Sequence, residues 1–249
     1  MIFIVKRLFL ILLLSFFSLN ASSINIAVAS NVSYAMQDLI KEFNKKFPDI
    51  KVKVILGSSG KLTTQITHGA PYQLFISADM TYPDALYKQN IAITKPRVYA
   101  LGSLALFSKK KMDFRDGIYM LNTPNISSIA IANPKTAPYG KATKESLLNA
   151  KIYKNIKKKL VYSESASQTL FFALSATDIA IVAKSALYSK NMKHYKRDQH
   201  WQELNPKLYT PIKQGMVLLE QNIDAREFYH FLLSDEAKKI FKNYGYKLP

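Results

Sequence analysis

Cysteine is absent from this chain of 249 residues. Its absence excludes a disulfide framework, and it excludes anchoring through a lipid-modified cysteine. The apolar run Leu8–Leu14 is short for a membrane span, which needs about 20 residues. We therefore expect a soluble protein that folds without forming disulfides.

Several catalytic and metal-binding motifs are also missing. The segment Gly57–Leu62 resembles a phosphate-binding loop, but Ile55 stands where that motif needs a glycine and Leu62 where it needs serine or threonine. No Gly-x-Ser-x-Gly nucleophile motif occurs in the sequence. No metal-ligand spacing connects the histidines, which are His68, His194, His200 and His230. The sequence thus predicts neither catalytic residues, nor a metal-cation site, nor a cofactor.

The N-terminus has the three parts of a secretory signal peptide. Lys6-Arg7 precedes the apolar run, and the small residues Ala21, Ser22 and Ser23 follow it. We predict that residues 1–23 are a signal peptide, cleaved after Ala21 or Ser23, and that the mature protein is periplasmic. An uncleaved N-terminal anchor is the alternative.

Acidic residues are scarce, with 17 of them against 35 lysines and arginines, so the formal net charge is +18. Such a charge raises the question of nucleic-acid binding. The lysines are scattered over helices that we predict to be exposed, and no arginine-rich stripe or zinc-finger spacing accompanies them. We therefore expect no nucleic-acid partner, and interpret the charge as a solvated surface that raises the association rate of small anions.

Short apolar strands alternate with amphipathic helices along the rest of the chain. This order predicts an α/β protein with two lobes, each a mixed, mostly parallel sheet flanked by helices. A long strand, Tyr99–Phe107, leads from one lobe to the other, and the apolar residues from Phe228 to Phe241 predict one closing helix. The predicted boundaries are residues 24–100 for lobe 1, 101–212 for lobe 2, and 213–249 for a segment that returns to lobe 1.

Four polar turns each follow a predicted strand and open a predicted helix. They are Ser30-Asn31, Ser58-Ser59-Gly60, Pro138-Tyr139-Gly140 and Ser165-Ala166-Ser167. The N-terminus of a helix has unpaired backbone N–H groups and a partial positive charge, so several such ends at one point make a site for an oxyanion.

The residue types at these turns suit a fully deprotonated anion, which only accepts hydrogen bonds. We expect Ser30, Asn31 and Ser59 to donate from lobe 1, with Ser58 beside them, and the backbone N–H groups of Tyr139 and Ala166 to donate from lobe 2. Neutral donors avoid the desolvation of a buried lysine or arginine. At any single turn the alternative is a helix cap without a ligand, a role worth about 1 kcal/mol.

The chain resembles the molybdate-binding proteins of bacterial ABC transporters, the ModA family, over nearly all of the predicted mature region. Ala29-Ser30-Asn31 and the segment 57–62 carry the resemblance in lobe 1. Its other carriers are the segments 69–79, 133–134, 137–140, 164–168 and 237–246.

The resemblance implies the fold of a type II periplasmic binding protein, with a molybdate or tungstate ion held in the cleft between two lobes that close about a hinge. Carried over to this chain, it implies Ser30, Asn31, Ser59, Tyr139 and Ala166 as ligands. Some family members have a tyrosine ligand where this sequence has Ala183. Asn31 is the expected replacement. The implied partner is an inner-membrane ABC permease, and the protein is expected to be a monomer without enzymatic activity.

Other functions fit parts of the sequence. A binding protein for sulfate or phosphate would use the same fold, and phosphate, which carries a proton at neutral pH, would favour a buried carboxylate acceptor. Glu164 is the acidic residue within the turns. An exported hydrolase would need a catalytic constellation, and the sensor domain of a transcription regulator would carry a helix-turn-helix segment instead of a signal peptide.

Overall fold

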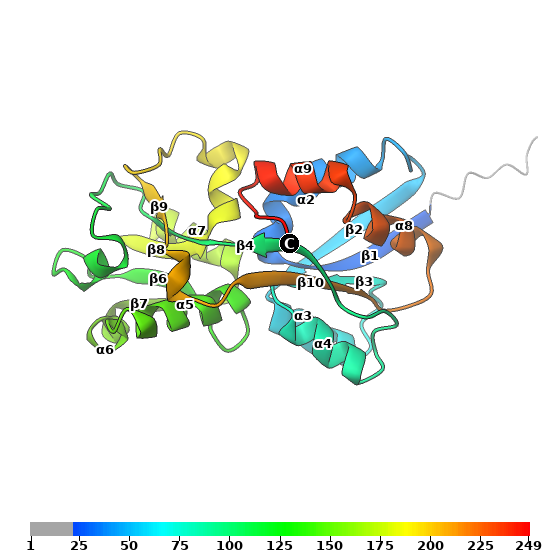
Figure 1. Ribbon diagram of the computed structural model, residues 1–249, viewed down its shortest axis with the longest axis horizontal. Coiled ribbons are helices and arrows are strands. Elements are labelled where there is room, and N and C mark those ends of the chain that lie inside the picture. The colour runs from blue at the N-terminus through cyan, green and yellow to red at the C-terminus, as the bar shows by residue number, and fades with distance from the viewer. Residues whose placement is uncertain (1–21) are drawn as a thin grey trace, which may run out of the picture.

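The computed structural model describes residues 22–249, so the predicted signal peptide falls almost wholly outside the described residues. Two five-stranded sheets lie side by side along the long axis of the molecule, each covered by helices (Figure 1). We call the part that contains the N-terminal strand lobe 1 and the other part lobe 2. This architecture confirms the predicted two-lobed fold.

Lobe 1 has a mixed sheet with helices on both faces. In spatial order its strands are β2 (Ile50–Gly57), β1 (Ser22–Ala29), β3 (Leu74–Ile76), β10 (Ile212–Leu218) and β4 (Arg97–Gly102). Strand β10 runs antiparallel to both neighbours, and β1, β2 and β3 are parallel. The helices are α2 (Ser33–Phe43), α3 (Ser59–Thr67), α4 (Thr81–Lys88), α8 (Ile223–Phe231) and α9 (Asp235–Asn243).

The side chains of β1 point alternately to the two faces of the sheet, and this divides the core of lobe 1 into two layers. Ile24, Ile26 and Val28 pack with α2, α8 and α9, whereas Ala27 faces the other way, toward α3 and α4. Successive side chains of a strand point to opposite faces, so both faces of the sheet are apolar and both need a layer of helices.

Lobe 2 repeats this plan. Its strands, in spatial order, are β7 (Leu160–Ser163), β6 (Ile129–Ala132), β8 (Ile179–Ala183), β5 (Leu104–Phe107) and β9 (Trp201–Glu203). Strand β5 is antiparallel to both neighbours, as β10 is in lobe 1. The α-helices are α5 (Pro138–Asn149), α6 (Tyr153–Ile156) and α7 (Ala166–Ser175).

The chain passes between the sheets at two places. Strand β4 ends at Gly102, opposite Ile212 of lobe 1, and β5 begins at Leu104, opposite Ala183 of lobe 2. The prediction of one strand from Tyr99 to Phe107 was therefore wrong, because its two halves pair in different sheets. The second passage lies between β9 and β10.

Two further predictions about helices needed correction. The closing helix is two helices, because the Ser234 hydroxyl accepts a hydrogen bond from the N–H of Ala237 and starts α9 anew. Ser30 and Asn31 lie in a short 3-10 turn, η1 (Ser30–Val32), that precedes α2.

Within residues 22–249 no helix is long and apolar enough to cross a membrane.

Candidate anion-binding site

A small cavity between the lobes gathers the predicted site residues. It measures about 10 Å³, so it admits only a small species while the lobes are in this arrangement. Lobe 1 lines it with Ala29, Ser30, Asn31, Gly57, Ser58, Ser59 and Ala78, and lobe 2 lines it with Ala137, Pro138, Tyr139 and Ala166. All six residues singled out in the sequence therefore meet at one place.

Parallel strand pairing brings these turns together. In lobe 1, Ala29 at the end of β1 lies opposite Gly57 at the end of β2. In lobe 2, Ala132 at the end of β6 lies opposite Ser163 at the end of β7. Helices α3, α5 and α7 begin just beyond these strand ends, so their positive dipole ends lie at the cavity.

The hydroxyls of lobe 1 have hydrogens to donate. The Ser59 Oγ accepts a hydrogen bond from the backbone N–H of Ala78 at 3.0 Å, and the Ser30 Oγ accepts one from the N–H of Ser167 at 3.3 Å. A serine hydroxyl has one hydrogen and can accept as well as donate. Accepting from a backbone N–H therefore leaves the hydroxyl hydrogen for an anion.

Ser58 differs from Ser30 and Ser59 in its hydrogen bonding. Its hydroxyl is buried and, among the described residues, has no hydrogen-bond partner. Ser58 occupies the N-cap position of α3 but makes no side-chain cap bond. The cap role, which was the alternative for this turn, is therefore not the one that the hydroxyl plays. An unpaired buried hydroxyl costs about 1–3 kcal/mol, so a ligand that accepts its hydrogen recovers that free energy.

Lobe 2 presents backbone instead of side chains. Tyr139 and Ala166 lie in the first turns of α5 and α7, where backbone N–H groups have no acceptor in a preceding turn. Gly140 permits close packing of α5 on β6, because a Cβ there would overlap the carbonyl oxygen of Ala132. Ser165 is a true cap, since its hydroxyl accepts from the N–H of Gln168 at 3.3 Å.

Asn31 does not match its predicted role as an amide donor. Its Nδ2 donates to the Oε1 of Gln214 at 2.8 Å and to the hydroxyl of Tyr246 at 3.0 Å. Both amide hydrogens are therefore used within the protein. What Asn31 can still offer an anion is its backbone N–H in η1. Ala183 is buried in β8 and does not line the cavity.

Among the described residues that line the cavity, none has a charged side chain. Burial raises the pKa of Tyr139 above its ordinary value, so its phenol stays neutral at physiological pH. Among residues 22–249, no cluster of histidine and carboxylate side chains could hold a metal ion. The cavity thus offers hydrogen-bond donors without a carboxylate acceptor, which suits a fully ionised oxyanion better than a protonated one.

The lobes touch beside the cavity. The backbone N–H of Gly60 in lobe 1 donates to the carbonyl of Thr136 in lobe 2 at 2.9 Å. An exposed ion pair between Lys61 and Glu164 also joins the lobes. The two lobes are therefore in direct contact at the edge of the cavity.

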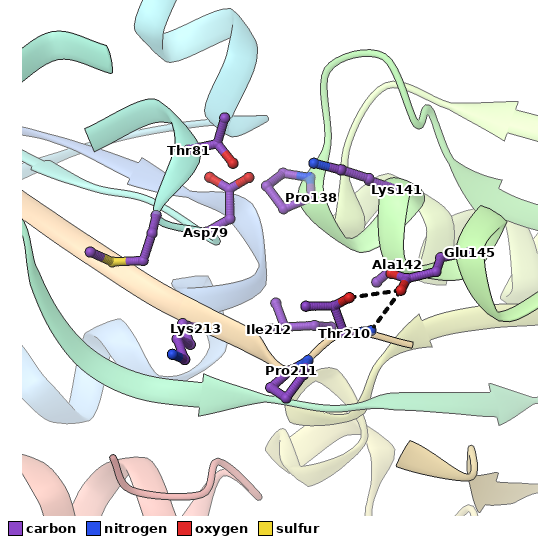
Figure 2. A pocket seen from close by; sticks show the side chains of 11 residues that line it. Asp79, Thr81, Pro138, Lys141, Ala142, Glu145, Thr210, Pro211, Ile212 and Lys213 are labelled. Atoms are coloured by element: carbon purple, nitrogen blue, oxygen red, sulfur yellow. Dashed lines mark hydrogen bonds between the residues drawn. The ribbon is translucent and has the colours of Figure 1, made fainter. Parts of the chain in front are cut away.

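A larger cleft of about 420 Å³ opens next to the cavity and shares Pro138 with it. Figure 2 shows Asp79 and Thr81 of lobe 1 facing the α5 residues Lys141 and Glu145 across this cleft. The Glu145 carboxylate accepts from the N–H and the hydroxyl of Thr210, at 3.0 and 2.7 Å. Charges of both signs line the cleft, so it lacks the purely donating character of the cavity.

Two residues near the site were missed in the sequence. Ala78 lines the cavity, and Gln214 bonds to residues that line it. A signal for Gln214 existed, because a glutamine within the mostly apolar strand Ile212–Leu218 needs a buried hydrogen-bond partner.

Comparisons with known proteins agree with this geometry. The molybdate-binding protein ModA of Azotobacter vinelandii is 33% identical over 235 residues, which are 92% of this chain and 91% of that protein. ModA of Rhodobacter capsulatus is also 33% identical, over 91% of this chain and 88% of that protein. The solved structure of the Azotobacter vinelandii periplasmic molybdate-binding protein superposes with a TM-score of 0.83 at 28% identity, covering 91% of this chain and 99% of that one.

A family model described as "Bacterial extracellular solute-binding protein" matches residues 24–247, which include both lobes and every residue of the cavity. The chain therefore belongs to the family of bacterial extracellular solute-binding proteins.

Proposed function

We propose that this protein captures molybdate or tungstate outside the cytoplasm and delivers it to an ABC permease. One observation carries the proposal: hydroxyls from lobe 1 and helix N-termini from lobe 2 converge on a cavity whose lining has no charged side chain. The names of the relatives, which are molybdate-binding proteins, support the choice of ion.

The proposed mechanism is closure about the two passages between the lobes. The ion binds first to the serine hydroxyls of lobe 1, and lobe 2 then adds the N–H groups of Tyr139 and Ala166 and excludes water. The permease recognises the closed form. In this proposal the protein acts as a monomer and without a cofactor. We also propose that it catalyses no reaction, because the described lining of the cavity contains donors but neither a nucleophile with its base nor a general acid.

Export by a cleaved signal peptide is part of the proposal. Cleavage after Ala21 leaves β1 whole, whereas cleavage after Ser23 removes Ser22 and Ser23, which pair with Ile50 and Lys51. The strand pairing favours the first position. Mass spectrometry of the protein recovered from the periplasm of an expressing cell would identify the mature N-terminus.

A thermal melt of the mature protein tests the ligand. A ligand at about 1,000 times its Kd stabilises a protein by about 4 kcal/mol, and each kcal/mol raises Tm by about 2–4 °C at this size. We expect molybdate and tungstate to raise Tm and sulfate and phosphate to leave it unchanged. A shift with sulfate alone would reassign the ligand, and no shift with any of these oxyanions would contradict an oxyanion-binding function.

A further inference from the structure

The side chain of Gln214 is an exception within its strand. It is completely buried in β10, where Met216, Val217 and Leu218 are apolar core residues. The pairing of β10 with β4 shifts between Gln214 and Gly215, a bulge that changes the direction of side chains. A buried primary amide is unfavourable unless it is hydrogen-bonded, so its partners explain its presence.

Those partners come from both lobes. The Oε1 of Gln214 accepts from the Nδ2 of Asn31 at 2.8 Å, within lobe 1. The Nε2 of Gln214 donates to the hydroxyl of Tyr139 at 3.0 Å, in lobe 2. Asn31 and Tyr139 both line the cavity, whereas Gln214 does not. We call these three side chains the Gln214 bridge.

Additional hydrogen bonds fix the Asn31 end of the bridge. The carbonyl of Asn31 accepts from the hydroxyl of Tyr246 at 2.9 Å and from the hydroxyl of Ser185, a lobe 2 residue, at 3.0 Å. The backbone of Asn31 is thus held from two sides. On the other side of the bridge, the Tyr139 side chain anchors the first turn of α5, whose N–H groups lie at the cavity.

We infer that Gln214 is a positioning residue for anion binding. It sets the distance between the η1 turn of lobe 1 and the α5 N-terminus of lobe 2, and it does so without contacting the ion. This inference rests on the proposed function, because it concerns the affinity of that same cavity. Strand β10 directly follows the second passage between the lobes, so the bridge forms at the hinge and contributes to closure. In metal sites, removing a group that orients the metal ligands lowers the affinity for the metal about 10-fold to 100-fold.

Two variants remove the bridge in different ways. Gln214→Met keeps a side chain of similar length but makes no hydrogen bonds to Asn31 or Tyr139. Tyr139→Phe removes only the hydroxyl and keeps the backbone N–H that faces the cavity, so it carries the test if Gln214→Met does not fold. The matched control is Tyr99→Phe, because the Tyr99 hydroxyl donates to the same Oε1 of Gln214 at 3.2 Å but lies within lobe 1.

The measurement is calorimetric titration with molybdate, together with Tm of each ligand-free protein. We expect Gln214→Met and Tyr139→Phe to raise Kd about 10-fold or more, and Tyr99→Phe to lower the ligand-free Tm while Kd stays within twofold of wild type. A purely stabilising role would lower Tm in all three and leave every Kd unchanged, which would overturn the inference. Equal weakening by Tyr99→Phe would overturn it too. If the wild type binds neither molybdate nor tungstate, both the proposed function and the inference about Gln214 are overturned. If the wild type and all variants bind with the same Kd, only the inference about Gln214 is overturned.

Discussion

The two lobes reach the cavity through the same strand-turn-helix unit but present different chemistry there. Lobe 1 lines the cavity with Ser30, Ser58 and Ser59, whose hydroxyls we propose as donors to the ion. Lobe 2 lines it with Tyr139 and Ala166, whose backbone N–H groups we propose as donors. A hydroxyl can be deleted by substitution, whereas a backbone N–H survives every substitution except proline. The lobes should therefore respond to mutation in opposite ways: lobe 1 should be sensitive to the side chain, and lobe 2 should tolerate changes that keep the backbone.

The largest effect is expected from Ala166→Pro. Ala166 is the first residue of α7, a position where proline is tolerated, and Ser165 before it is extended, with φ −148° and ψ 165°, as a residue before proline prefers. The helix should form while its N–H donor is lost and the ring occupies the space of the ion. Since one hydrogen bond to a charged group is worth about 1.5–3 kcal/mol, we expect Kd for molybdate to rise about 100-fold.

Ala166→Ser is the control, because it changes the side chain but keeps the N–H. Its Kd should stay within about threefold of wild type. A folded proline variant that binds with wild-type affinity would show that this backbone group is not a donor to the ion.

Ser59→Ala should have the next largest effect, raising Kd about 10-fold or more through the loss of one charge-assisted hydrogen bond. It also leaves the N–H of Ala78 without its acceptor, so the free energy of unfolding should fall by about 1 kcal/mol. Titration calorimetry and urea unfolding measure the two effects separately. Thr67→Ala, which removes an exposed hydroxyl from the same helix, should change neither much.

Ser58→Ala sharpens the distinction between a ligand and a structural hydroxyl. Because this hydroxyl has no partner among the described residues, its removal should not lower the stability of the ligand-free protein. Affinity should nevertheless fall about 10-fold, and the two results together would identify a hydroxyl reserved for the ligand. Unchanged affinity would mean that the Ser58 hydroxyl does not contact the ion.

The smallest effect is expected from pH. The cavity lining, as far as residues 22–249 form it, has no histidine, lysine or carboxylate. Burial raises the pKa of Tyr139 above its ordinary value of 10.0, so its neutral form is favoured still further. Neither lobe therefore changes its protonation at the cavity between pH 6 and pH 9. Kd for molybdate should be constant over this range in calorimetric titrations at fixed ionic strength. A change of more than about threefold would mean that a titrating group outside the cavity controls closure.

Much of the fold was predictable because its signals are local. Apolar runs such as Ile129–Ala132, each followed by a polar turn and an amphipathic segment, indicate strands and helices directly. The break at Ser103 was not predictable, because Leu101 and Leu104 are equally apolar and only their pairing partners differ. Likewise, the spacing of apolar residues that suggested one closing helix continues on both sides of the Ser234 cap, so it did not reveal the division into α8 and α9.

In the candidate site, too, some features were predictable from the local sequence and others depended on distant residues. The turns were recognisable because serine, asparagine, proline and glycine favour turns and helix starts, and each of the four groups follows an apolar strand. The roles of the individual donors were not recognisable. The sequence predicted Asn31 as a donor and placed Ser58 only beside the donors. In the fold, the amide hydrogens of Asn31 are taken by Gln214 and Tyr246, whereas the Ser58 hydroxyl has no partner among the described residues.

The sequence by itself determined the alternation of strands and helices, and it determined that the hydrogen-bond donors at the four turns are uncharged. The tertiary structure alone decided which donors remain for a ligand. The physical reason is that a hydrogen bond depends on distance in space, and the partners that decide the matter lie far apart in the chain. Asn31 and Gln214 are 183 residues apart, and Ser30 and Ser167 are 137 apart. Only folding brings each pair within hydrogen-bonding distance.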